Sequence, residues 1–191
     1  MSALFTIGHS NRPLEGLIAL LSENGITRLA DVRTLPRSRH NPQFDRETLP
    51  AALLRAGISY LHLPELGGLR RPRPDSMHRG WKNGGFRGFA DYMETPAFAA
   101  ALEALLALAA RERVASMCAE ALPWRCHRTL IADAALARGV AAEHILGDQS
   151  VRPHALTSFA RIVGGCVTYP EIDPPLPGLE EFLDRRAAGH D

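Results

Sequence analysis

The strongest constraint on the fold is an alternation along the chain between short apolar runs and segments of helical periodicity. The run ALFTI (3–7) ends at a glycine and predicts a buried strand, and apolar residues then repeat at helical spacing from Leu14 to Leu21. Further strands are expected over 28–33, 58–63, 114–118, 140–146 and 166–169. Further helices are expected over 46–56, 88–94, 96–112, 126–139 and 154–162.

The predicted helices carry recognisable start and stop signals. Ser10 or Asn11 can cap the first helix, and Pro13 suits its first turn. Glycines at 25, 57 and 139 follow helical segments and are typical helix stops.

Strands that alternate with helices predict a three-layer α/β fold, with a mostly parallel sheet of five to six strands and helices on both faces. The 191 residues, 46% of them apolar, suit a single domain over 1–191. Two segments stand outside the alternation. Residues 64–88 form a long basic loop, and 171–191 form a Pro-rich bend followed by a short helix.

Composition excludes several classes of protein. The net charge of +1 indicates no particular partner, and three cysteines, an odd number, argue against a disulfide scaffold. No apolar run approaches the roughly 20 residues of a membrane span, and the N-terminus lacks the pattern of a signal peptide. We therefore expect a cytoplasmic protein with reduced cysteines and no membrane contact; the sequence predicts no oligomeric state.

Polar residues gather where the predicted strands end. In open parallel sheets, ligands bind beyond the carboxyl ends of the strands, so these residues predict a site at one edge. They comprise His9, Ser10 and Asn11; Asp31, Arg33 and Ser38; His62, Gly67 and Gly68; Cys118, Glu120, Arg125, Cys126, His127 and Arg128; and His144 on the fifth strand.

Four motifs carry a family resemblance: TIGHSN (6–11), DVRTLPRS (31–38), YLHLPELGG (60–68) and MCAE with CHR (117–128). Together and in this order they resemble the "TIGHS" family, domain of unknown function 488. The resemblance implies an α/β domain and implies that these residues belong together, but it implies no particular activity. The segment 69–88 departs from the pattern.

The stretch MCAEALPWRCHR leaves several interpretations open. Cys118 could be a nucleophile near Arg125, or a small buried thiol. The loop CAEALPWR has no glycine that would let backbone N–H groups cradle an anion, and the nearby Glu120 disfavours a thiolate. Cys118, Cys126 and His127, with His9 or His144, could bind zinc, but seven residues separate the cysteines where structural sites use two to four. No metal or cofactor is predicted, with zinc and a reversible disulfide as minor alternatives.

Anion binding is the favoured interpretation. Cys126, His127 and Arg128 open a helix, where free N–H groups favour negative charge, and arginine suits phosphate. Arg33, Arg125 and Arg128 are predicted to bind the anion. The same sequence pattern would arise if these arginines formed ion pairs with carboxylates that fix the loops. The remaining predicted binding residues are Ser10, Asn11, Ser38, His62, Gly67, Gly68 and His144.

Glu120 is the predicted general acid or base, with Cys118, His9 and Asp31 as the other catalytic candidates.

The segment 69–88 contains six basic side chains and one acidic side chain, interleaved with Trp81 and Phe86. This composition suits the binding of nucleotides or single-stranded nucleic acid, and it equally suits a mobile lid.

The sequence thus predicts an enzyme, a hydrolase or group transferase, acting on an anionic, phosphate-bearing, nucleotide-like or nucleic-acid substrate. A non-catalytic nucleotide or nucleic-acid binding module is the alternative, and a metal- or redox-linked thiol protein is a further one.

Overall fold

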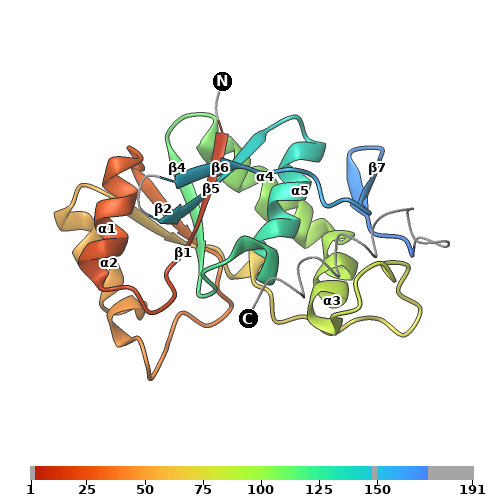
Figure 1. The fold of residues 1–191 in the computed structure, drawn as a ribbon, viewed down its shortest axis with the longest axis horizontal. Helices are drawn as coiled ribbons and strands as arrows, with labels where there is room; N and C mark the ends of the chain where they lie inside the picture. The colour runs from red at the N-terminus through yellow and green to blue at the C-terminus, as the bar shows by residue number, and fades with distance from the viewer. Residues whose placement is uncertain (1–2, 148–149, 172–191) are drawn as a thin grey trace, which may run out of the picture.

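A computed structural model describes residues 3–147 and 150–171 of the chain. Its main sheet has six strands, shown in Figure 1. These are β1 (Ala3–Gly8), β2 (Arg28–Asp31), β3 (Ser59–His62), β4 (Val114–Cys118), β5 (Ala141–Gly147) and β6 (Ser150–Pro153). Their order is β3-β2-β4-β1-β5-β6, and only β6 runs antiparallel to its neighbour. The predicted mostly parallel sheet is confirmed.

Helices cover both faces of this sheet. One face carries α1 (Leu14–Glu23) and α2 (Leu49–Arg55), and the other carries α3 (Gly84–Met93), α4 (Pro96–Ala109) and α5 (Arg128–Ala137) (Figure 1). Alternation along β1 supplies both cores, because Leu4 packs in one and Phe5 in the other. The three-layer α/β prediction is confirmed.

The predicted helix stops are confirmed, but the predicted N-terminal cap of the first helix is wrong. Gly25, Gly57 and Gly139 follow the helices with φ of 63°, 75° and 75°, a conformation that glycine adopts without strain. Ser10 and Asn11 do not cap α1, which begins after Pro13 without a side-chain cap. The Ser10 N–H instead donates to the carbonyl of Ala119, which ties this turn to the chain beyond β4.

The helix predicted over 154–162 is wrong. Residues 154–160 are irregular, and β7 (Arg161–Val163) and β8 (Cys166–Thr168) then form a hairpin that turns at Gly164 and Gly165. Asp133 accepts hydrogen bonds from the Thr157 backbone and hydroxyl, which holds this backbone out of a helix. The strand predicted over 166–169 exists as β8, but it belongs to this separate two-stranded sheet.

The basic segment over 64–88 is largely irregular yet packed. It holds a 3-10 helix, η2 (Pro64–Leu66), and α3 begins at Gly84 rather than near 88 because the Asn83 side chain caps it. The Trp81 ring stacks on Phe86 with centroids 4.6 Å apart and meets Phe159 edge-on. Trp81 is thus occupied by internal packing rather than presented to a ligand.

The described part of the chain holds two other 3-10 helices, η1 (Pro42–Phe44) and η3 (Pro123–Arg125). Except for Glu171, the predicted C-terminal bend and helix over 171–191 lie outside the described residues. Within 3–147 and 150–171 no single helix is long and apolar enough to cross a membrane; only α3 and α4, bent by 83° at their junction, pass that test as a pair.

Candidate functional site

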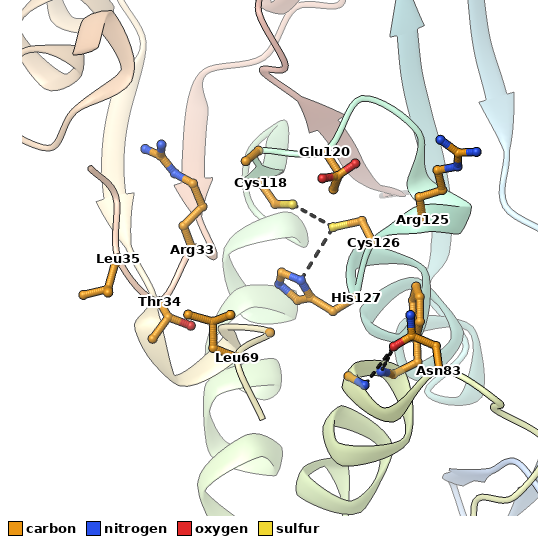
Figure 2. Close-up of a pocket in the computed structure, with 14 residues that line it drawn as sticks. Arg33, Thr34, Leu35, Leu69, Asn83, Cys118, Glu120, Arg125, Cys126 and His127 are labelled. Carbon is orange, nitrogen blue, oxygen red and sulfur yellow. Dashed lines mark hydrogen bonds between the residues drawn. The ribbon is translucent and has the colours of Figure 1, made fainter. Parts of the chain in front are cut away.

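A cavity of about 350 Å³ lies at the carboxyl edge of the sheet, beside the ends of β2 and β4 (Figure 2). It brings together seven of the predicted site residues: Arg33, Gly68, Cys118, Glu120, Arg125, Cys126 and His127. Parallel strands place their carboxyl ends at one edge, so residues far apart in the sequence meet there.

The cavity contains a pair of thiols. Cys118 is the last residue of β4 and Cys126 lies just before α5, and their sulfur atoms are 2.7 Å apart (Figure 2). Both side chains are buried and both cysteines are free. The third cysteine, Cys166 on β8, is exposed and does not line the cavity.

The two thiols differ in acidity. The pKa of Cys126 is lowered to about 6, because it accepts a hydrogen bond from the Cys118 thiol and lies near the Arg128 guanidinium and backbone N–H. The same contact with Cys126, together with burial, raises the pKa of Cys118 well above its usual value. These opposite shifts in pKa favour a thiolate on Cys126 over one on Cys118.

His127 borders the thiol pair. Its Nδ1 lies 3.6 Å from the Cys126 sulfur, and burial lowers its pKa. Gly68 packs against this ring so closely that a Cβ there would lie 2.4 Å from Nδ1. Gly68 thus shapes the cavity by leaving room for the imidazole.

Cys118, Cys126 and His127 also form a cluster that could hold a metal ion, found among residues 3–147 and 150–171, with donor atoms within 4.8 Å of one another. Tetrahedral zinc with Zn–S bonds of about 2.3 Å would hold two sulfurs roughly 3.8 Å apart. The observed sulfur separation of 2.7 Å is too short for that arrangement. The two sulfurs are in direct contact with each other.

Arg128 is nearly inaccessible, with 1% of its surface exposed. Its Nη2 donates to the carbonyls of Glu120 and Ala121, and its Nη1 donates to the Thr6 hydroxyl. Predicted as an anion-binding residue, Arg128 here anchors the chain that follows β4, and it does not line the cavity.

A buried chain of polar contacts joins Arg128 to Asp133. The Asp133 carboxylate accepts from His154 Nε2 at 2.8 Å, and His154 Nδ1 lies 3.0 Å from His144 Nε2. His144 Nδ1 lies 2.7 Å from the Thr6 hydroxyl, which accepts from Arg128. The chain thus links a buried guanidinium to a buried carboxylate through groups that are themselves hydrogen-bonded.

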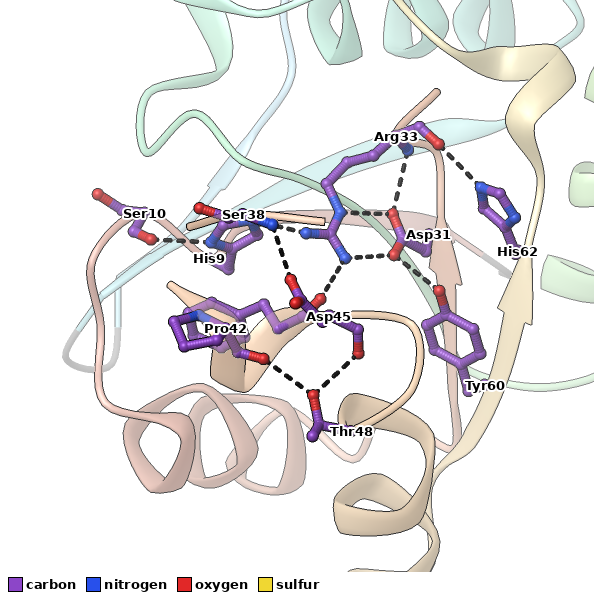
Figure 3. A network of polar contacts seen from close by, with 11 residues as sticks. His9, Ser10, Asp31, Arg33, Ser38, Pro42, Asp45, Thr48, Tyr60 and His62 are labelled. Atoms are coloured by element: carbon purple, nitrogen blue, oxygen red, sulfur yellow. Dashed lines mark hydrogen bonds and ion pairs between the residues drawn. The ribbon is translucent and has the colours of Figure 1, made fainter. Parts of the chain in front are cut away.

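A second polar cluster surrounds Arg33 at the end of β2 (Figure 3). Arg33 donates twice to the buried Asp31 carboxylate and once each to the Phe44 carbonyl and His9 Nε2. Tyr60 also donates to Asp31, and His9 Nδ1 donates to the Ser10 carbonyl. Burial lowers the pKa of His9 to about 4, so His9 is neutral and serves as an acceptor for Arg33.

The other predicted site residues do not line the cavity: His9, Ser10, Asn11, Asp31, Ser38, His62, Gly67, Arg128 and His144. Most support its walls. His62 donates to the carbonyl of Arg33, Ser38 is held by Asp45, and a Cβ at Gly67 would strike the Thr34 hydroxyl.

Several wall residues were not among the predicted site residues: Thr34, Leu35, Leu69, Asn83, Gly85, Phe86 and Ala119. Thr34 and Leu35 lie inside the motif DVRTLPRS, and Asn83 before two glycines is a recognisable helix start, so a signal existed for these. Phe86 lies among the basic residues of 69–88, a pattern that suits nucleotides, whereas Leu69 carries no such signal, because only the path of the chain over 67–86 brings it to β4.

Fold and site together define an α/β protein with a buried thiol pair at the carboxyl edge of its sheet. The family model described as "Domain of unknown function DUF488" matches residues 13–135, and the chain belongs to this family. The match begins just after TIGHSN and includes the other three motifs. Searches of curated proteins and of solved structures found no match.

Proposed function

We propose that the chain is an enzyme, a hydrolase or group transferase, that uses Cys126 as a nucleophile on a small anionic substrate. The observation that carries the proposal is the Cys126 sulfur at the start of α5, lining the cavity, with a pKa of about 6. A thiol with such a pKa is largely thiolate at neutral pH and is a competent nucleophile.

The positive end of α5 supports this choice of nucleophile over Cys118. The Arg128 N–H, in the first turn of the helix, donates to the Cys126 sulfur at 3.5 Å. The N-terminus of α5, which the sequence predicts to bind an anion, therefore stabilises the Cys126 thiolate.

Arg125 is the proposed anion-binding residue. Its side chain is exposed and lines the cavity, and among the described residues it forms no ion pair. Arg33 and Arg128 are engaged internally and serve to hold the walls. A cavity of about 350 Å³ suits a nucleotide-sized ligand or one end of a nucleic acid, with Leu35, Leu69 and Phe86 as apolar walls.

In this proposal the Cys126 thiolate attacks the electrophilic centre of the substrate and the leaving group departs with a proton. Glu120, on the same wall of the cavity (Figure 2), then assists the water or acceptor that releases the group from sulfur. We place the protein in the cytoplasm, where thiols stay reduced.

Alkylation by iodoacetamide, followed peptide by peptide by mass spectrometry, tests the nucleophile. Cys126 should react with half-maximal rate near pH 6, whereas the exposed Cys166 should respond only at more alkaline pH. Equal pH profiles for the two cysteines would remove the proposed nucleophile.

Protection by inorganic pyrophosphate tests the anion site. Pyrophosphate should slow alkylation of Cys126 in the wild type but not in Arg125→Ala, with the exposed Arg79→Ala as a matched control. Hydrolysis of nucleotides is then compared in Cys126→Ser and Glu120→Gln. Protection without any turnover would favour the non-catalytic binding module.

A further inference from the structure

Cys118 has no covalent role in the chemistry proposed above, although its sulfur lies 2.7 Å from that of Cys126 and faces the same cavity. We propose that the pair is an oxidation site, at which a hydroperoxide forms a Cys118–Cys126 disulfide that small thiols reduce. The inference rests on the thiolate assigned to Cys126 and adds hydroperoxides as a second class of reactant.

The backbone presents the two sulfurs to each other. A disulfide bond of about 2.05 Å requires them to approach by only about 0.7 Å. Cys118 is fixed at the end of the sheet, since its carbonyl accepts the His9 N–H at 3.0 Å. Cys126 is fixed between η3 and α5, where its N–H donates to Pro123 and its carbonyl accepts from Thr129.

The connecting loop is also held in place. The buried Arg128 donates to the carbonyl of Glu120, and Ser10 donates to that of Ala119 at 2.9 Å. The two cysteines therefore meet because the loop between them is anchored from β1 and α5. Ring closure needs little rearrangement of the chain, which favours a rapid reaction within the molecule.

The chemistry proceeds in two steps. The Cys126 thiolate attacks one peroxide oxygen, the O–O bond breaks, and the alkoxide leaves and takes a proton, so that Cys126 becomes a sulfenic acid. The Cys118 sulfur then attacks the Cys126 sulfur, and the hydroxyl leaves as water with the thiol proton of Cys118. Two molecules of an external thiol reverse the disulfide and become oxidised themselves.

The distribution of donors supports this division of roles. The Cys126 sulfur accepts the Arg128 N–H in the first turn of α5, a contact that favours a thiolate on Cys126 rather than on Cys118. The first attack therefore belongs to Cys126, and Cys118 is available to resolve the sulfenic acid. Neither role falls to Cys166, which is exposed on β8.

The test treats the full-length protein with hydrogen peroxide and maps its peptides under non-reducing conditions. In a Cys166→Ser background, we expect a loss of two hydrogen atoms, a peptide linked through Cys118 and Cys126, and full recovery with dithiothreitol. Cys118→Ser should instead accumulate a sulfenic acid on Cys126 that dimedone traps. Cys126→Ser should oxidise at least roughly tenfold more slowly at Cys118.

Several outcomes decide the matter. A sulfinic acid on Cys126 in the wild type, with no linked peptide, overturns the inference, as does a disulfide that involves Cys166. If Cys118→Ser fails to fold, as judged by circular dichroism, the wild-type peptide map still decides. Rapid alkylation of Cys126 without disulfide formation would refute the oxidation site alone, whereas the absence of both reactions would refute the proposed nucleophile as well.

Discussion

Arg128 holds two parts of the site with a single buried guanidinium. It fixes the loop after β4 through the carbonyls of Glu120 and Ala121, and its charge stabilises the Cys126 thiolate. Lysine could not replace it, since one ammonium group cannot reach these acceptors in the same planar geometry. At the scale of residues, the acidity of Cys126 thus depends on a side chain that the cavity does not expose.

Gly8 also determines the position of the loop after β4, because that loop packs against its backbone. A Cβ at Gly8 would lie 1.8 Å from the Glu120 carbonyl oxygen and close to Ala121, so the loop after β4 lies directly against the β1 backbone. We expect Gly8→Ala to lower the free energy of unfolding by about 2 kcal/mol or more through overpacking, measured by urea denaturation.

Gly16 on α1 provides a matched control, because a Cβ there meets only the Pro13 ring at 3.8 Å. Gly16→Ala should change stability by no more than about 1 kcal/mol, in the stabilising direction expected for alanine in a helix. Similar losses for both variants would contradict the close packing of Gly8 under the loop.

At the scale of elements, α5 holds two separate segments of the chain in place through two of its buried charged side chains. Arg128, at its start, fixes the loop around the thiols, and Asp133, one and a half turns later, fixes residues 154–169. The hydrogen-bonded chain through Thr6, His144 and His154 joins these two charges across β1 and β5. The helix thereby links the site to the C-terminal hairpin.

Asp133→Asn tests this linkage. The amide nitrogen cannot accept the hydrogen bonds that reach Asp133 from His154, Thr157 and Tyr169. Because these buried hydrogen bonds to a charged acceptor are lost or weakened, the free energy of unfolding should fall by about 3 kcal/mol. Hydrogen exchange should show protection lost first over 154–169.

The exposed Glu103→Gln on α4 makes the same chemical change without buried partners and should alter stability by less than about 0.5 kcal/mol. If residues 154–169 keep their protection in Asp133→Asn, the carboxylate does not hold that segment.

At the scale of the whole molecule, buried histidines set the response to acid. Burial lowers the pKa of His9 and of His144 to about 4, with further lowering by Arg33 in the first case and by His154 and Arg128 in the second. Both values lie below the usual 6.5 of an unfolded histidine, so the unfolded state binds more protons between these limits.

Stability should therefore decrease as the pH falls from about 6.5 to about 4, by about 3 kcal/mol for each histidine. Urea denaturation across this range measures the slope. His144→Gln should reduce the slope by the contribution of one proton, while substitution of the exposed His40 should not. A pH-independent stability would mean that both imidazoles protonate in the native state.

The order of elements and the edge that carries the site follow from the sequence, because periodicity and helix stops are local properties of the chain. Strand–helix alternation predicted the sheet and its two helical layers, and parallel strands necessarily bring Arg33 and Cys118 to one edge. The family motifs likewise marked residues that the fold gathers around the thiol pair.

The partners of the charged groups were decided only by the tertiary structure. Local patterns could not show that Asp133 would hold 154–160 out of a helix, that Arg33 and Arg128 would be engaged by internal acceptors, or that Arg125 would remain exposed. They also could not show that Cys118 and Arg128 would lie close enough to Cys126 to lower its pKa. Hydrogen bonds and electrostatic fields act through distance in three dimensions, and spacing along the chain does not encode that distance.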